Sequence, residues 1–391
     1  MNRITLTLAC ATLVLGTSTY FVTGVLNPMA VDLGVSVGVA GQLVSAFAIA
    51  YAVAAPLLAA TTARLPRRGL LCAALVTFGA ANLLAAVAPD FGVLLLSRVL
   101  CALSAALATP IALAVGAGLT PLDRRGAALA LVMGGITVAF ALGIPLGTYV
   151  SALAGWRAMF LGLGGLSWVA AAAVYRVLPP VPGATHGGFG AFAVLREPGI
   201  TPILVLTVLA IAVGFSVFSY IGPVLSELTG LADDAIGGLL LVFGFAAIAG
   251  TYVGGTLADR IDPARMATIF LVMMTLATAG YSLAAPLGHG TASRIAVAAV
   301  LFFSAFPGFA FMPLQQYRLV EQAGEHAHLA LALNASAVFL GQGLGAMLGG
   351  VAAMTGTLAY NGAVGAVLGV AAIGVSVILN RILARQAAAR A

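Results

Sequence analysis

The sequence predicts an all-α membrane protein with twelve transmembrane helices, arranged as two pseudo-symmetric six-helix halves. Of its 391 residues only 7% are charged and 62% are hydrophobic, and the mean hydropathy is +1.13. A soluble protein carries roughly 25% charged residues, so this chain has too little polar surface to face water. Backbone polar groups in lipid must pair within the protein, which favours helices.

Twelve apolar stretches are long enough to cross a bilayer, since a crossing takes about 20 residues. They cover residues 5–28, 39–60, 69–88, 92–118, 127–150, 158–178, 200–224, 235–257, 266–286, 292–316, 328–352 and 357–380. The turn-prone segment 355–362 divides the last two. The first stretch is expected to remain as a helix, because no cleavage site with a polar start follows it.

Arginine positions predict that both chain termini lie in the cytoplasm. An even number of spans puts the termini on one side, and this orientation places most of the 17 basic residues in cytoplasmic loops. The proline- and glycine-rich stretch 179–199 is predicted to be a cytoplasmic linker. It separates an N-terminal half, 1–178, from a C-terminal half, 200–391.

A charged motif recurs in the two halves. GTLADRIDPAR, 255–265, follows the second span of the C-terminal half, and AATTARLPRR, 59–68, is a worn copy at an offset of 196. A second repeated motif is GIPLG, 143–147, which corresponds to GAMLG, 345–349, at an offset of 202. Parallel repeats of six helices are one plan on which membrane transporters are built.

These motifs, with LLLSRVLCALSAA (94–106) and GGITVAFALGIPLG (134–147), resemble those of the major facilitator superfamily over essentially the whole chain. The runs GWRAMF (155–160) and GQLVSAFAIAYAVAAPLL (41–58) are similar to its drug/proton antiporter branch, and most like exporters of sugars, purines, nucleosides and neutral drugs. The resemblance implies a multidrug-type efflux protein of the bacterial inner (plasma) membrane. It also implies a monomer that needs no cofactor.

The charged motif is expected to form a cytoplasmic latch that holds the inner side shut. Glycines let two helices approach closely, and a carboxylate at Asp259 can meet a helix N-terminus. The alternative is a solvated, positively charged loop. The expected latch residues are Arg64, Arg67, Gly255, Asp259, Arg260 and Arg265.

Arg98 lies within the fourth span. An intramembrane arginine costs roughly 2.5–3.5 kcal/mol on insertion scales, so it is expected to face the protein interior or a cavity. The alternatives are snorkelling to the outer headgroups, or a structural partner for carbonyls of the first two spans. The resemblance implies a place beside the proton and substrate path.

Polar or aromatic side chains at middle depth are the candidates for binding substrate. By resemblance, the first, fourth, seventh and tenth spans line the cavity. The candidates are Thr19, Tyr20, Phe47, Arg98, Phe140, Phe215, Ser219, Phe243, Phe306, Asn334 and Gln342. Each aromatic residue has lipid-facing or core packing as its alternative.

Small residues are expected to allow close helix packing in the fifth and eleventh spans. The resemblance implies a tight seam between the halves there, with ordinary helix packing as the alternative. The residues concerned are Gly143, Pro145, Gly147, Gly345 and Gly349.

No Asp, Glu or His lies in the middle of any predicted span. Thr19 stands where many related exporters carry an acidic residue. A cation needs a counter-charge in a pocket of low dielectric, so neutral or weakly anionic solutes are favoured. Proton coupling would have to use a carboxylate near the outer end, such as Asp32 or Glu227, or the substrate itself.

The predicted function is therefore export of a small organic solute by alternating access, as a proton-coupled antiporter. A proton-independent uniporter and a transporter-fold sensor remain as alternatives. Scattered arginines form no basic patch, which argues against nucleic acid, and the cysteine spacing fits no metal motif. The segment GEHAH, 324–328, has one histidine pair in a predicted loop, which fits a solvated surface better than the active site of an enzyme.

Overall fold

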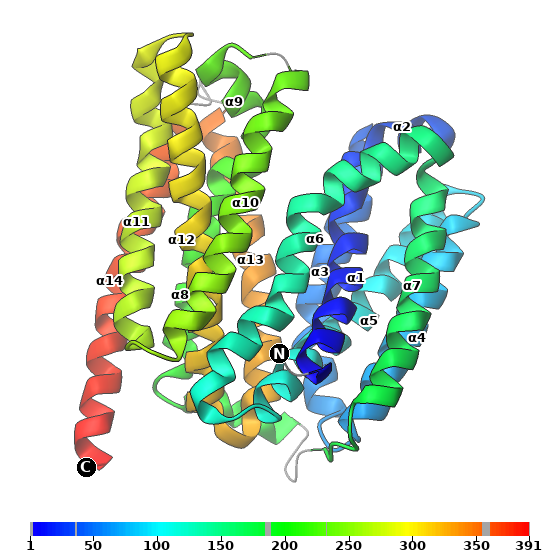
Figure 1. Cartoon of the computed structure of the whole chain (residues 1–391), viewed down its shortest axis with the longest axis vertical. Coiled ribbons are helices and arrows are strands. Elements are labelled where there is room, and N and C mark those ends of the chain that lie inside the picture. Colours follow the sequence, from blue (N-terminus) through cyan, green and yellow to red (C-terminus); the bar gives the residue numbers. More distant parts are fainter. Residues whose placement is uncertain (1–2, 36, 184–188, 232, 354–359, 391) are drawn as a thin grey trace. The chain divides into compact units, whose positions relative to one another are not determined.

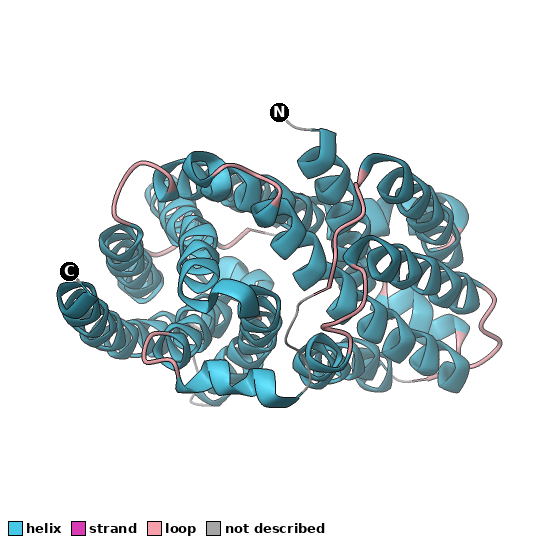
Figure 2. Cartoon of the chain, turned by 90° about the horizontal axis from the view of Figure 1, so that it is seen from below, coloured by secondary structure: helices cyan, strands magenta, loops and turns pink. Residues whose placement is uncertain are grey.

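The computed structural model describes residues 3–35, 37–183, 189–231, 233–353 and 360–390, and in these residues it is all helical (Figures 1 and 2). The long helices are α1 (Arg3–Gly24), α3 (Val37–Thr61), α4 (Arg67–Ala86), α5 (Phe91–Gly118), α6 (Arg125–Ala154), α7 (Trp156–Val177), α8 (Ile200–Phe218), α10 (Asp233–Ala258), α11 (Pro263–Ala284), α12 (Thr291–Ala323), α13 (Ala327–Ala353) and α14 (Tyr360–Arg390).

Eleven apolar stretches in the described residues are long enough to cross a membrane. One of them, Thr291–Gly350, holds both α12 and α13, so the described chain has the twelve long helices that the sequence predicts. The predicted fold class is confirmed, while the side on which the termini lie stays a prediction. Residues 355–359 of the predicted turn and 184–188 of the predicted linker lie outside the described residues.

The first long helix of each half is followed by a short helix. α1 is followed by α2 (Leu26–Asp32), and α8 by α9 (Ile221–Thr229), where continuous spans were predicted. The residues that open the short helices, Val25 and Tyr220, have nearly the same backbone angles, φ −122° with ψ 14° and φ −121° with ψ 21°. Both lie near the sparsely occupied bridge region. The breaks at Val25 and Tyr220 are separated by nearly the predicted offset of 196 residues, so they support the internal repeat.

The chain divides into two compact units. Unit 1 comprises Met1–Val194 with Gly324–Ser336, and unit 2 comprises Leu195–Ala323 with Ala337–Ala391. In unit 1, α1 packs on α6, α4 on α7, and α5 on both α3 and α4. In unit 2, α12 packs on α10 and α11, and α14 on α8 and α11. The predicted boundaries at 178 and 200 stay a prediction.

Helix α12 runs past its predicted end at residue 316 and reaches Ala323. Arg318, which follows the predicted end of this span, therefore lies within α12 and is only 3% exposed. Sequence hydropathy falls at Gln315, Gln316 and Arg318, but all three side chains are buried. Helices can continue through polar residues when neighbouring helices satisfy their hydrogen bonds.

Candidate functional site

Arg98 lies about two turns into α5, which begins where the Asp90 carboxylate accepts a hydrogen bond from the Val93 N–H (2.9 Å). Its side chain is fully buried, in agreement with the expectation that it faces the protein interior. Nη1 donates to the Ser18 carbonyl oxygen of α1 (3.1 Å), and the Phe47 ring of α3 lies 4.6 Å from the guanidinium carbon. A desolvated cation–π contact of this kind contributes about 2 kcal/mol.

The Arg98 guanidinium belongs to a longer polar chain. The Ser18 hydroxyl, 3.4 Å from Arg98 Nη1, donates to Asn82 Oδ1 (2.7 Å), and Asn82 Nδ2 donates to the Phe78 carbonyl within α4 (2.8 Å). Ser18 and Asn82 are fully buried as well. Sequence reasoning missed both residues. The signal for Asn82 was a lone amide in an apolar span, because a buried amide needs partners.

Two nitrogens of Arg98, Nε and Nη2, are buried and have no hydrogen-bond partner within the described residues. The acids of the predicted N-terminal half lie elsewhere: Asp32 pairs with Arg157, Asp90 caps α5, and Asp123 lies 3.7 Å from Arg124. Buried donors are almost always paired in proteins. Arg98 is thus a buried cation with spare donor capacity.

The two carboxylates considered for proton coupling are not buried. Asp32 has a side chain 45% exposed and forms an ion pair with Arg157, which also stacks 4.2 Å from the Trp156 ring and donates to the Ala88 carbonyl (3.1 Å). Arg157 thereby ties α7 to the end of α2 and to the loop after α4. Glu227 in α9 is exposed.

Unit 1 contains two aromatic pairs that include predicted substrate residues. Tyr20 of α1 meets Phe140 of α6 edge to face, with centroids 4.8 Å apart. Phe47 lies 6.1 Å from Tyr51, one turn further along α3, and Tyr51 is 5% exposed. Thr19 turns its hydroxyl back to the Leu15 carbonyl (3.0 Å). Tyr51 was missed, although residues four apart share a helix face.

Unit 2 contains a run of aromatic rings across α8, α10 and α12. Phe215 contacts Phe218 (5.5 Å), Phe218 stacks on Phe243 (4.9 Å), and Phe243 meets Phe309 (6.1 Å). Phe306 does not form a ring pair with these four; it pairs with Phe270 of α11 (6.2 Å) and Phe302 (5.7 Å). The structure thus separates Phe306 from the other two predicted aromatics.

The remaining predicted substrate residues are dispersed. Ser219 is exposed at the end of α8. Asn334 is 1% exposed and belongs to the part of α13 that is grouped with unit 1, whereas Gln342 is half-buried and belongs to unit 2.

At the charged motif, Gly254 and Gly255 are buried at the end of α10, and a Cβ on Gly254 would collide with the Ala310 carbonyl oxygen of α12. Asp259 is half-buried. Asp262 caps α11 by accepting a hydrogen bond from the Ala264 N–H (3.0 Å). Arg260 and Arg265 are exposed. Two features of this region hold helices in place: Gly254 allows α10 to approach α12 closely, and the Asp262 carboxylate caps α11.

A buried polar junction, which sequence reasoning missed, lies beside this motif. Arg318 donates to Gln315 Oε1 (3.0 Å) and, through Nη2, to Asn380 Oδ1 of α14 (3.0 Å). Asn380 Nδ2 in turn lies 3.1 Å from Thr268 Oγ1 of α11, and Gln315 donates to the Ile203 carbonyl of α8 (3.3 Å). The junction therefore ties four helices of unit 2 together.

The N-terminal copy of the motif holds the start of the linker. Arg67 is buried, its backbone N–H donates to the Val181 carbonyl (2.9 Å), and its Nη2 donates to the Ala63 carbonyl (2.7 Å). A Cβ on Gly183 would collide with the Arg64 carbonyl oxygen, so only glycine fits there. The Arg64 residue itself is exposed.

The predicted packing glycines lie at close helix contacts inside the units. A Cβ on Gly147 of α6 would lie 2.9 Å from Phe21 Cβ of α1, and one on Gly143 would lie 3.4 Å from Tyr20 Cβ. A Cβ on Gly345 of α13 would lie 2.6 Å from the Ala212 carbonyl oxygen of α8, and one on Gly349 would collide with the Ser216 carbonyl oxygen. Pro145 is exposed within α6. The seam between the halves stays a prediction.

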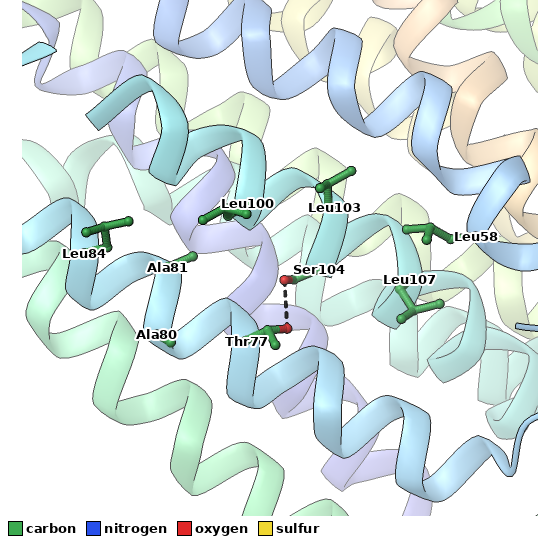
Figure 3. Close-up of a pocket in the computed structure, with 9 residues that line it drawn as sticks. All are labelled: Leu58, Thr77, Ala80, Ala81, Leu84, Leu100, Leu103, Ser104 and Leu107. Atoms are coloured by element: carbon green, nitrogen blue, oxygen red, sulfur yellow. Dashed lines mark hydrogen bonds between the residues drawn. The ribbon is translucent and has the colours of Figure 1, made fainter. Parts of the chain in front are cut away.

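A pocket of about 480 Å³ lies between α3, α4 and α5 in unit 1 (Figure 3). Five leucines and two alanines line it, with the hydroxyls of Thr77 and Ser104 hydrogen-bonded to each other (3.0 Å). None of the predicted substrate residues is among its lining residues. Its apolar wall offers contact but few polar groups that would orient a ligand.

Comparison with known proteins supports one family. The family model described as Major Facilitator Superfamily matches residues 8–346. The inner membrane transport protein YdhP of Escherichia coli (strain K12) is 31% identical over 91% of this chain and 90% of YdhP. A chloramphenicol resistance protein of Streptomyces lividans is 37% identical over 65% of this chain and 66% of its own length.

Among solved structures, that of the proton:xylose symporter XylE superposes with a TM-score of 0.80, covering 97% of this chain and 95% of XylE. The two sequences are 15% identical, so the likeness concerns the fold alone.

Proposed function

Because the chain belongs to the Major Facilitator Superfamily, and so is a multi-pass membrane transporter of a small-molecule substrate and not an enzyme, we propose that it exports small neutral or weakly anionic organic solutes by alternating access. Export is driven in this proposal by proton antiport, and the protein works as a monomer in a bacterial inner membrane. The similarity to a chloramphenicol resistance protein supports the export direction.

The buried Arg98 is the observation that carries the substrate class. It is fully buried, its nearest neighbours are neutral, and two of its nitrogens lack partners in the described chain. An unpaired charge in a region of low dielectric repels a cation and attracts an acceptor oxygen or an anion. The Phe47 ring beside Arg98, and Tyr51 one turn further along α3, add apolar contact area for an organic solute.

Flux into proteoliposomes tests the proposal. With chloramphenicol as the neutral probe, uptake is expected to follow an imposed pH gradient. Arg98→Ala is expected to reduce the rate at least tenfold, which corresponds to about 1.4 kcal/mol, a typical charge-assisted hydrogen bond. Arg294→Ala, which removes an exposed arginine from α12, serves as the matched control and should keep the wild-type rate.

Flux that ignores both the pH gradient and the membrane potential would contradict antiport and favour a uniporter. Full flux in Arg98→Ala would remove Arg98 from the path. If chloramphenicol does not move, and a sugar, a purine and a nucleoside tested in the same way do not move either, export itself is contradicted and a sensor built on this fold becomes the better hypothesis.

The latch predicts an effect of Asp259→Asn on the conformational balance. Losing about 1 kcal/mol from the closed inner side should increase the open population roughly fivefold. The measurement is labelling by a membrane-impermeant maleimide of a single cysteine introduced at Thr19 in a background without Cys10, Cys72 and Cys101. Asp123→Asn, in the exposed loop before α6, is the control. Equal labelling of wild type and Asp259→Asn would contradict the latch.

A further inference from the structure

Asn82 lies close to the positive charge of Arg98, but its neutral amide does not compensate that charge. Its Oδ1 accepts the hydrogen of the Ser18 hydroxyl (2.7 Å), and the same Ser18 oxygen lies 3.4 Å from Arg98 Nη1. One hydroxyl therefore separates the amide of Asn82 from the guanidinium. A carboxylate at residue 82 would have the same shape and would lie close enough to act as a counter-ion.

All three side chains are completely shielded from solvent, so water and salt screen the charge on Arg98 much less than they would at the surface. Two of its other close neighbours, the Phe47 ring and the Ser18 carbonyl oxygen, are neutral. The acids Asp32, Asp90 and Asp123 are engaged at helix ends, as described above. These three acids therefore do not compensate Arg98 in the described structure, and residue 82 is a position from which a single substitution could do so.

We propose that Asn82 is a specificity-determining residue: its neutral amide holds the Ser18–Arg98 pair in place while leaving the arginine charge uncompensated, so that unit 1 disfavours cationic solutes. The inference takes one premise from the proposed function, namely that solutes bind near unit 1. At an effective dielectric of about 20, a unit charge 10 Å away changes the binding of a monovalent ion by roughly tenfold.

The first arm of the test measures thermal unfolding of the purified protein. Asn82→Asp is expected to unfold close to the wild-type temperature, since the attraction of Arg98 for the new carboxylate offsets the loss of the hydrogen bond from Asn82 Nδ2 to the Phe78 carbonyl oxygen (2.8 Å). The matched control is Asn361→Asp in α14. Asn361 is also fully buried and donates to the Ser216 carbonyl oxygen (3.1 Å), and no arginine is bonded to Ser216 in the described part of the chain. It is expected to unfold well below wild type, because an unpaired buried charge is costly.

The second arm measures ligand charge preference with tetraphenylphosphonium and tetraphenylborate, two hydrophobic ions of similar size and opposite charge. Binding is followed by the shift in unfolding temperature. Asn82→Asp should move the ratio of the two affinities about tenfold towards the cation, and Arg98→Met should move it in the same direction.

An unchanged ratio in folded Asn82→Asp and Arg98→Met would overturn the proposal, as would Asn82→Asp unfolding as early as Asn361→Asp. Failure of the wild type to bind tetraphenylborate, the anion, would overturn it too. Neither arm requires transport. A protein that shows the charge preference but carries no solute in proteoliposomes would therefore contradict the proposed function and leave this inference standing.

Discussion

Gly135→Ala is expected to destabilise unit 1 strongly. A Cβ on Gly135 of α6 would collide with the Ala9 carbonyl oxygen and Thr12 Oγ1 of α1, and would lie 2.8 Å from the Leu13 nitrogen. Backbone atoms cannot rotate away, so α1 would have to retreat and break the hydrogen bond from the Thr12 hydroxyl to the Val132 carbonyl (2.6 Å). Overpacking costs about 1–3 kcal/mol in ordinary cores, and the upper end or more is expected here.

Gly134→Ala is the matched control, because a Cβ on Gly134 meets no atom within 4 Å. Both substitutions gain about 0.8–1 kcal/mol of helix propensity, so Gly134→Ala should be neutral or slightly stabilising. The measurement is the yield of monodisperse protein and its unfolding temperature in detergent. Similar behaviour of the two variants would show that α1 and α6 do not depend on this close approach.

Asn380→Leu is expected to cost unit 2 about 1–3 kcal/mol, the usual penalty for leaving a buried donor without its hydrogen-bond partner. Arg318 would lose the acceptor of its Nη2 hydrogen bond while remaining in a site where it is 3% exposed. Thr268 Oγ1 would lose its contact with Asn380 as well. The expected observation is a clear fall in unfolding temperature.

The double variant Arg318→Met with Asn380→Leu distinguishes a charge effect from a packing effect. Replacing a buried ionic group and its partner by apolar residues of similar volume is often neutral, so the double variant should be more stable than Asn380→Leu alone. Additive losses from the two single variants would contradict the junction as described, because residues in one network are expected to be coupled.

The long helices could be predicted because bilayer thickness sets their length and apolar composition sets their number. The breaks after α1 and α8 were not predicted, although a proline follows each break by three residues, Pro28 after Val25 and Pro223 after Tyr220. A proline has no backbone N–H to donate within a helix, so it favours a break in the preceding turn. Arg98 was recognisable as a buried charge from its place within a span. Its partners were not, because Ser18 and Asn82 are 64 residues apart in sequence and meet only after α1, α4 and α5 pack.

The burial of Arg318 could not be predicted either, because its partners are also brought together only by helix packing. A charge near two glutamines resembles the end of a membrane helix, and its burial depends on two acceptors, Gln315 Oε1 on α12 and Asn380 Oδ1 on α14. The glycines at α1–α6 and α8–α13 were predicted as packing residues, whereas their partners came from the structure.

By itself, the sequence determined that this chain crosses a membrane many times, repeats one half-unit and places an arginine where no acid accompanies it, because each of these follows from composition and spacing along one chain. The tertiary structure decided which neutral groups surround Arg98, that Asn82 lies one hydroxyl away from it, and that Arg318 ties four helices together. Such contacts join helices distant in sequence, and their hydrogen bonds exist only where packing brings donor and acceptor within about 3 Å.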